Sequence, residues 1–182
     1  MTSTLTISAS DDCYARLSNT FNNTDTFLYV GEAENDQNRN PRDWFRFVVP
    51  LAGNTTIISA DLFVTASNGA VSAGSISVGC EDATGPATPT TAADLFARTM
   101  TGAQIATLEA YVADTVYHYD VDSAVAAVLA RSDWVYGSVM AVMIDDDATD
   151  KIHRVYSVRN GSGGAYLQIV VPSFVPRGVG LV

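Results

Sequence analysis

The sequence predicts an all-β protein: an antiparallel two-sheet β-sandwich of the jelly-roll type, with one amphipathic crossover helix and a partly helical insertion. Three observations predict it. About ten short apolar or alternating stretches are separated by Gly, Pro, Asn or Asp, as strands separated by turns are. Hydrophobic residues make up 47% of the 182 residues and charged residues 16%, which favours a well-packed core. A single stripe of helical period stands between two of the expected strands.

The stretch 117–144 organises the chain. It opens with alternating Tyr-His-Tyr-Asp-Val-Asp and closes with a continuous apolar run, Val-Met-Ala-Val-Met-Ile, which are typical of a half-buried and a fully buried strand. Between them Val121, Val125 and Leu129 belong to one apolar stripe, which predicts a short crossover helix. Asp120 is placed to cap this helix, because a short acidic side chain there accepts a hydrogen bond from the first turn.

The remaining strands follow from alternation and turn residues. We expect them at 4–8, 11–17, 27–31, 44–50, 58–65, 75–80, 151–158 and 165–172.

The segment 81–114 departs from this pattern. Prolines mark a loop at its start, and 91–100 predicts a short helix. Thr101 with Gln104 resembles a capping box, which predicts a second short helix. Because long excursions of this kind are usually functional, we expect this segment to touch a partner.

The charge balance argues against several partners. The net charge is −10, and no basic footprint for nucleic acid or an anionic membrane is visible. The N-terminus lacks the basic and apolar regions of a signal peptide, and no apolar run approaches the ~20 residues of a membrane span. The chain is therefore expected to be made in a cytoplasm, where Cys13 and Cys80 are interpreted as small buried residues.

No catalytic arrangement stands out. The Gly-Ser-Gly at 161–163 lacks the pattern of a nucleophile elbow. His118 and His153 lie on predicted strands without a third ligand nearby, as ordinary strand residues do. We therefore expect the protein not to be an enzyme.

An acidic loop is the candidate metal site. Carboxylates and carbonyls are the ligands of Ca²⁺, although Tyr156 stands where an EF-hand would have its bidentate Glu. Two interpretations stay open: a solvated turn, or a structural Ca²⁺ bound here or at Asp11 and Asp12. No other cofactor is expected. The candidate ligands are Asp145, Asp146, Asp147 and Asp150.

Two further sets of residues are candidates for contact. An apolar tail at 173–182 follows a single domain at 1–172, and we expect it to dock on that domain or on a neighbouring subunit. Trp44 and Trp134 are candidates for a glycan-stacking platform, with a place in the core or an interface as the alternative. The tail residues expected at an interface are Phe174, Val175, Pro176, Val179 and Leu181.

A series of short motifs follows the chain in order: Asp11-Asp12, Leu28-Tyr29-Val30-Gly31, Arg46-Phe47, Ile57-Ile58-Ser59-Ala60-Asp61-Leu62, Tyr119-Asp120-Val121-Asp122, Tyr136-Gly137, Tyr156-Ser157 and Leu167-Gln168-Ile169. This order resembles the DNRLRE-type, carbohydrate-binding-module-like jelly-roll domains over about residues 8–171. The chain departs from the family at 81–114, where the family usually has a Trp-containing segment.

The resemblance implies a function. Such domains occur on microbial surface proteins, on carbohydrate-active enzymes and in phage particles. A solitary, leaderless copy looks like a phage decoration (cement) protein or another virion protein. This implies a non-enzymatic protein that binds the major capsid protein lattice and its own copies, with a trimer favoured by icosahedral three-fold positions. The alternative is a carbohydrate-binding module that recognises host glycans.

Overall fold

The computed structural model describes residues 2–16, 20–30, 41–69, 74–146, 153–161 and 163–173. Their strands are β1 (Thr2–Ser8), β2 (Asp11–Arg16), β3 (Thr20–Asn22), β4 (Phe27–Val30), β5 (Arg42–Val48), β6 (Ser59–Thr65), β7 (Gly74–Glu81), β8 (Met100–Leu108), β9 (Val116–Asp120), β10 (Val139–Asp146), β11 (His153–Tyr156) and β12 (Tyr166–Pro172). The helices are α1 (Ala92–Ala97), α2 (Asp122–Leu129) and the 3-10 turn η1 (Val158–Asn160).

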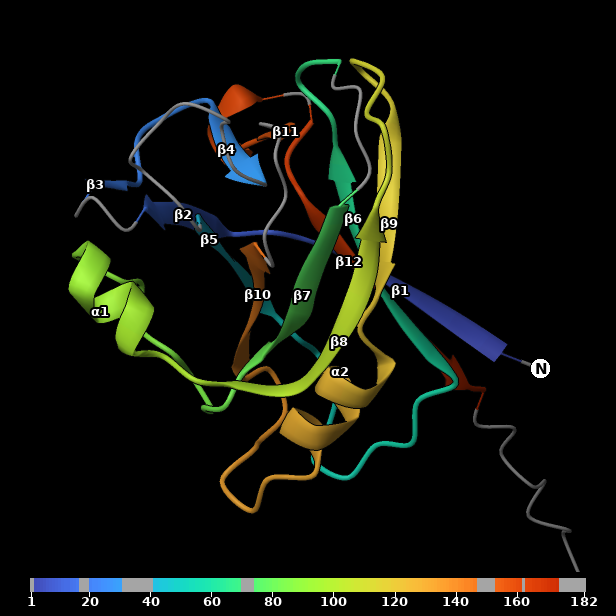
Figure 1. Cartoon of the computed structure of the whole chain (residues 1–182). Coiled ribbons are helices and arrows are strands. Elements are labelled where there is room, and N and C mark those ends of the chain that lie inside the picture. Colours follow the sequence, from blue (N-terminus) through green and yellow to red (C-terminus); the bar gives the residue numbers. More distant parts are fainter. Residues whose placement is uncertain are drawn as a thin grey trace, which may run out of the picture.

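The strands form two antiparallel sheets and a small third one (Figure 1). The four-stranded sheet has the order β1-β12-β6-β9, the six-stranded sheet has the order β3-β2-β5-β10-β7-β8, and β11 pairs with β4. From β5 onward the chain passes between the two large sheets at each step, apart from the β7–β8 hairpin and the detour through β11. This places β1-β12-β6-β9 opposite β5-β10-β7-β8, the eight-stranded arrangement of a jelly roll, and the predicted fold class is confirmed.

The predicted crossover helix is α2, which closes one end of the sandwich (Figure 1). Its buried face belongs to the main core between the sheets. Its N-cap is Val121 and not Asp120, although the Asp120 carboxylate does accept a hydrogen bond from the Asp122 backbone N–H at 2.8 Å. Gly102 of β8 lets the helix approach: it has a φ of +59°, and a Cβ there would lie 2.5 Å from the Ala124 backbone.

The second predicted helix, beginning at Thr101, is wrong. Residues 100–108 form strand β8, which pairs with β7 along the edge of the six-stranded sheet. The capping-box pattern is local, whereas the ladder with β7 satisfies the backbone of most of the segment. The first predicted helix is confirmed as α1.

Helix α1 packs on the outer face of the six-stranded sheet. Thr91 caps its start by accepting a hydrogen bond from the Asp94 backbone N–H at 3.1 Å. A second, smaller core lies beneath it and consists of Cys13, Ala15, Trp44, Ala92, Leu95, Ala141 and Met143. Among the described residues, neither helix has the length and apolarity that a membrane-spanning helix needs.

Candidate functional site

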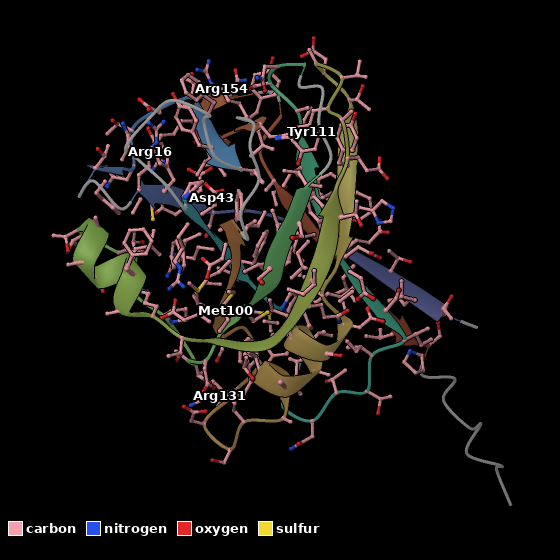
Figure 2. All side chains as sticks on the ribbon, viewed as in Figure 1. Arg16, Asp43, Met100, Tyr111, Arg131 and Arg154 are labelled. Atoms are coloured by element: carbon pink, nitrogen blue, oxygen red, sulfur yellow. The ribbon has the colours of Figure 1, made fainter. Side chains whose placement is uncertain are left out.

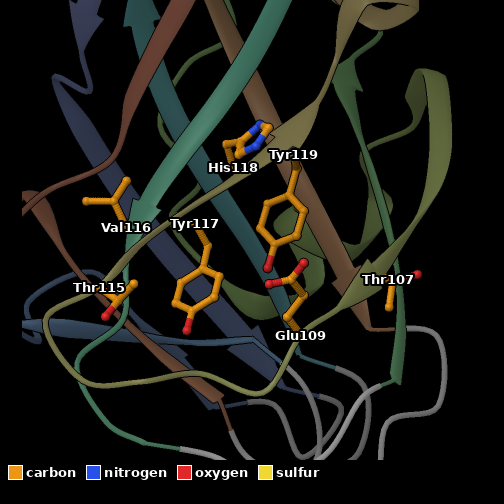
Figure 3. Close-up of a pocket in the computed structure, with 7 residues that line it drawn as sticks. All are labelled: Thr107, Glu109, Thr115, Val116, Tyr117, His118 and Tyr119. Atoms are coloured by element: carbon orange, nitrogen blue, oxygen red, sulfur yellow. The ribbon is translucent and has the colours of Figure 1, made fainter.

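An open groove of about 420 Å³ lies between β8 and β9, the terminal strands of the two large sheets (Figure 3). Thr107 and Glu109 line one side, and the five successive residues 115–119 line the other. Successive side chains of a strand point to opposite faces of its sheet. A groove that touches five in succession therefore runs along the free edge of β9.

Tyrosine rings form the inner wall of the groove. The hydroxyl groups of Tyr119 and Tyr111 lie 2.6 Å apart, and the Tyr117 ring stacks on the Tyr111 ring at 4.4 Å. The Tyr117 hydroxyl accepts a hydrogen bond from the Val112 backbone N–H at 2.8 Å. Burial raises the pKa of Tyr111 and Tyr119, and the charge of Glu109 raises that of Tyr119 further. These tyrosines are therefore uncharged, and their hydroxyl groups bind other groups of the protein.

Three polar side chains that line the groove are available to bind a ligand. Thr107, Glu109 and Thr115 make no side-chain hydrogen bond or ion pair with any residue of the described chain. His118 points to the outer face, where its Nδ1 lies 3.2 Å from an Asp61 carboxylate oxygen. The groove lining thus has three side chains that are free to form hydrogen bonds, and one of them is a carboxylate.

Aromatic rings cross the outer face of the four-stranded sheet. The His118 ring stacks on Phe63 with centroids 5.4 Å apart, and Phe63 stacks on Tyr166 at 4.6 Å with the ring planes within 4°. Their faces cover one another, so Phe63 offers its edge to solvent and not a flat face.

Exposed apolar side chains gather in two places. The first, here called the groove rim, consists of Val116, which lines the groove, Ile105 of β8 and Val112 of the connection between β8 and β9. The second, here called the end patch, consists of Val48, Val135 and Tyr136. Val48 belongs to it because it pairs with Val139, just after the loop that carries the other two. Tyr136 is 72% exposed, the most of these residues.

Both tryptophans lie in cores, which corrects the expectation of a glycan-stacking platform. Trp44 is fully buried beneath α1, and its Nε1 donates to Glu81 at 2.8 Å. Trp134 is 5% exposed in the main core, and its Nε1 donates to the Leu51 carbonyl at 3.0 Å. Neither ring has a face that a sugar could reach.

The structure gives Asp145 a different partner from a metal. Arg42 binds it in a bidentate ion pair, with N–O distances of 2.5 Å for both bonds. Asp146 is the last residue of β10, and Asp147 and Asp150 lie outside the described residues.

The other predicted calcium position, at Asp11 and Asp12, is filled by donors. Asp12 is buried and accepts hydrogen bonds from the Ser157 hydroxyl at 2.8 Å and the Val158 backbone N–H at 2.7 Å, and it also pairs with Arg159. Arg159 reaches Asp11 as well, at 2.7 Å. The pair joins β2 to η1 as an ion-pair clamp. No group of three metal-ligating side chains occurs in the described part of the chain.

Arginines at one end of the molecule lie against aromatic rings (Figure 2). The Arg16 guanidinium is 3.8 Å from the Tyr29 ring centroid, and Arg154 is 4.9 Å from Phe27 and 5.0 Å from Tyr29. These contacts hold the arginines against rings of β4.

The tail residues expected at an interface, Phe174, Val175, Pro176, Val179 and Leu181, lie outside the described residues, and their contacts stay a prediction. Sequence reasoning missed the groove. Its signal was present in the uncharged stretch 100–108, which reads as a strand once the capping box is set aside.

Comparisons with known proteins do not place the chain in a family. No family model matches the sequence, and no curated protein matches it.

Proposed function

We propose that this protein is a non-enzymatic virion structural protein that decorates the head of a phage. The observation that carries the proposal is the end patch: Val135 and Tyr136 stand exposed on a jelly roll whose buried ion pairs and stacked rings act as structure. Exposed apolar groups fixed on a rigid scaffold are typical of a protein that works by surface contact.

The mechanism would be burial of apolar area against the capsid lattice. Each Å² removed from water contributes about 25 cal/mol before the cost of association is subtracted. Many copies on one shell would add through avidity, so a weak single contact is enough. The resemblance to jelly-roll domains of phage particles supports the same proposal.

The test is binding to purified phage heads that lack the protein, measured by co-sedimentation. The double variant Val135→Ser/Tyr136→Ser should bind at least tenfold more weakly than the wild type. Ile58→Ser is the matched control, because Ile58 is also exposed, at 51%, but precedes β6 of the four-stranded sheet, whereas Val48 of the end patch belongs to the six-stranded sheet. Wild-type protein that stays in the supernatant, or a double variant that binds like the control, would contradict the proposal.

Oligomeric state adds a second measurement. A decoration protein of three-fold positions is expected to be a trimer by light scattering, and removal of residues 173–182 is expected to weaken that trimer. If the truncated chain still formed a trimer, the tail would not be needed for assembly.

Carbohydrate recognition is the weaker candidate. The two tryptophans of the protein are buried, and the Phe63 and Tyr166 rings at the surface stack on each other. A sugar platform needs an open ring face, and the Phe63 ring is stacked on both sides, by His118 and Tyr166.

A further inference from the structure

The free edge of β9 presents a defined set of backbone groups. The Val121 backbone N–H donates to the Ala60 carbonyl, and the Ala66 backbone N–H donates to the Thr115 carbonyl, both at 2.9 Å. In an antiparallel pair, alternate residues direct their N–H and C=O groups toward the partner strand. The odd-numbered residues of β9 therefore face β6, and Val116 and His118 direct their backbone groups away from it, along the groove.

The two strands that border the groove are unprotected at their edges. β9 is the last strand of its sheet and β8 is the last strand of the other, and no described strand pairs with either free edge. Proteins usually guard such edges with Lys, Pro or a covering element. Neither strand contains Lys, Arg or Pro, and the α2 backbone approaches β8 at Gly102.

We propose that the groove between β8 and β9 is a docking site for an extended peptide segment of a partner protein, which adds to β9 as a further strand. The five residues 115–119 offer roughly 16 Å of edge, enough for a segment of similar length. The side chains of the groove rim stand beside it and would contact alternate side chains of the peptide. This inference does not rest on the virion role.

Charge selects the kind of peptide. Glu109 is the acidic side chain that lines the groove, Asp120 follows at the end of β9, and none of the lining residues is Lys or Arg. The whole chain also carries a net charge of −10. A segment with at least one Lys or Arg placed near Glu109 is therefore favoured, and acidic segments are repelled.

The first test needs the protein alone. Amide hydrogen exchange should be fast at Val116 and His118, whose N–H groups face the groove, and slow at Tyr117 and Tyr119, whose N–H groups face β6. Equal protection at all four positions would overturn the proposal, because the edge would then be satisfied already.

The second test is selection of 12-residue peptides from a random displayed library on the full chain. Selected peptides should be enriched in Lys and Arg and should protect the Val116 and His118 amides. Their affinity should fall at least tenfold in His118→Pro, which removes one outward N–H, and much less in His118→Ala, which removes the same side chain but keeps that N–H. A library that yields no binder, or binders that do not distinguish the two variants, would overturn the proposal.

Glu109→Lys keeps the experiment decisive if His118→Pro does not fold, because Glu109 lies outside both strands. This variant should weaken the same basic peptides at least fivefold, and by less at high ionic strength. Peptides that bind Glu109→Lys as tightly as the wild type, or whose chemical-shift changes map away from β9, would place the site elsewhere and overturn the proposal.

Discussion

The outer faces of the two large sheets differ in burial: one is covered by a helix, and the other is exposed. Over β2, β5 and β10, helix α1 covers a buried cluster that includes the whole of Trp44. Within the described part of the chain, no helix covers the outer face of the four-stranded sheet, and every outward side chain of its strands is at least partly exposed. Both faces carry aromatic residues in alternating strands, so the strand pattern alone does not decide which of them is buried.

The outer face of the six-stranded sheet is buried because α1, which is distant in the chain, is bound to it. Arg42 of β5 donates to the carbonyls of Leu95 and Phe96, both at 3.3 Å, and of Arg98 at 2.7 Å, at the end of α1. It also pairs with Asp145 of β10. One arginine thus donates to three carbonyls at the C-terminal end of a six-residue helix and holds that helix on the sheet.

The largest expected effect comes from removing an aromatic ring on each face. Trp44→Ala should lower the free energy of unfolding by about 3–5 kcal/mol, because it empties a fully buried site and removes one of the donors to Glu81, which keeps Arg98. Phe63→Ala should cost about 1 kcal/mol, since its ring stands at the surface. Urea unfolding followed by circular dichroism measures both. Equal losses would mean that the open face is covered in solution.

The next effect concerns the ion pairs beneath α1. Arg98→Met should lower the free energy of unfolding by about 3 kcal/mol, because it leaves Glu81 buried without the cation that lies 3.0 Å away. Arg131, labelled in Figure 2, is the matched control, since its partners Asp82 and Asp133 are exposed. Arg131→Met should leave the unfolding midpoint nearly unchanged. A small loss in Arg98→Met would show that α1 is held by packing alone.

The fold was predictable because its signals are local. Alternation and turn residues locate most strands, and the stripe through Val125 locates α2. Strand β8 was missed because Thr101 and Gln104 imitate a helix start, and only the distant partner β7 shows that the segment is extended. Local sequence patterns therefore predict most helices and strands, but pairing with distant strands decides whether an ambiguous segment is helical or extended.

The candidate sites were less predictable, because they depend on contacts between distant residues. Trp44 is hidden by a helix that begins 48 positions later in the chain, at Ala92. Asp145 is neutralised by Arg42, 103 residues away. The groove exists only because β8 and β9 end their sheets side by side. These arrangements depend on partners that are distant in the chain, so the neighbouring residues alone do not predict them.

Strand β9 allows the same comparison within a single element, because Tyr119 points inward and His118 outward. Burial raises the pKa of Tyr111 and Tyr119, so the folded chain keeps these protons above pH 10 while the unfolded chain loses them. Their contribution to stability is complete below pH 10. It should fall above pH 10 by about 1.4 kcal/mol per pH unit for each tyrosine.

Urea unfolding between pH 9 and 11 measures this slope. The double variant Tyr111→Phe/Tyr119→Phe removes both hydroxyl groups together, so neither is left without its partner, and should flatten the slope above pH 10. An unchanged slope would assign the alkaline loss to other groups.

The smallest effect is expected on the open face itself. His118→Ala removes a half-stacked ring and a contact with Asp61 in which the histidine side chain is 65% exposed. Solvent screens such a pair, and its loss should change the free energy of unfolding by less than about 1 kcal/mol. A double-mutant cycle with Asp61→Asn isolates the pair, and its coupling should stay within about 0.5 kcal/mol. A coupling of 2 kcal/mol or more that grows with protein concentration would show that a second copy covers this face, and the difference between the two outer faces would then belong to the monomer alone.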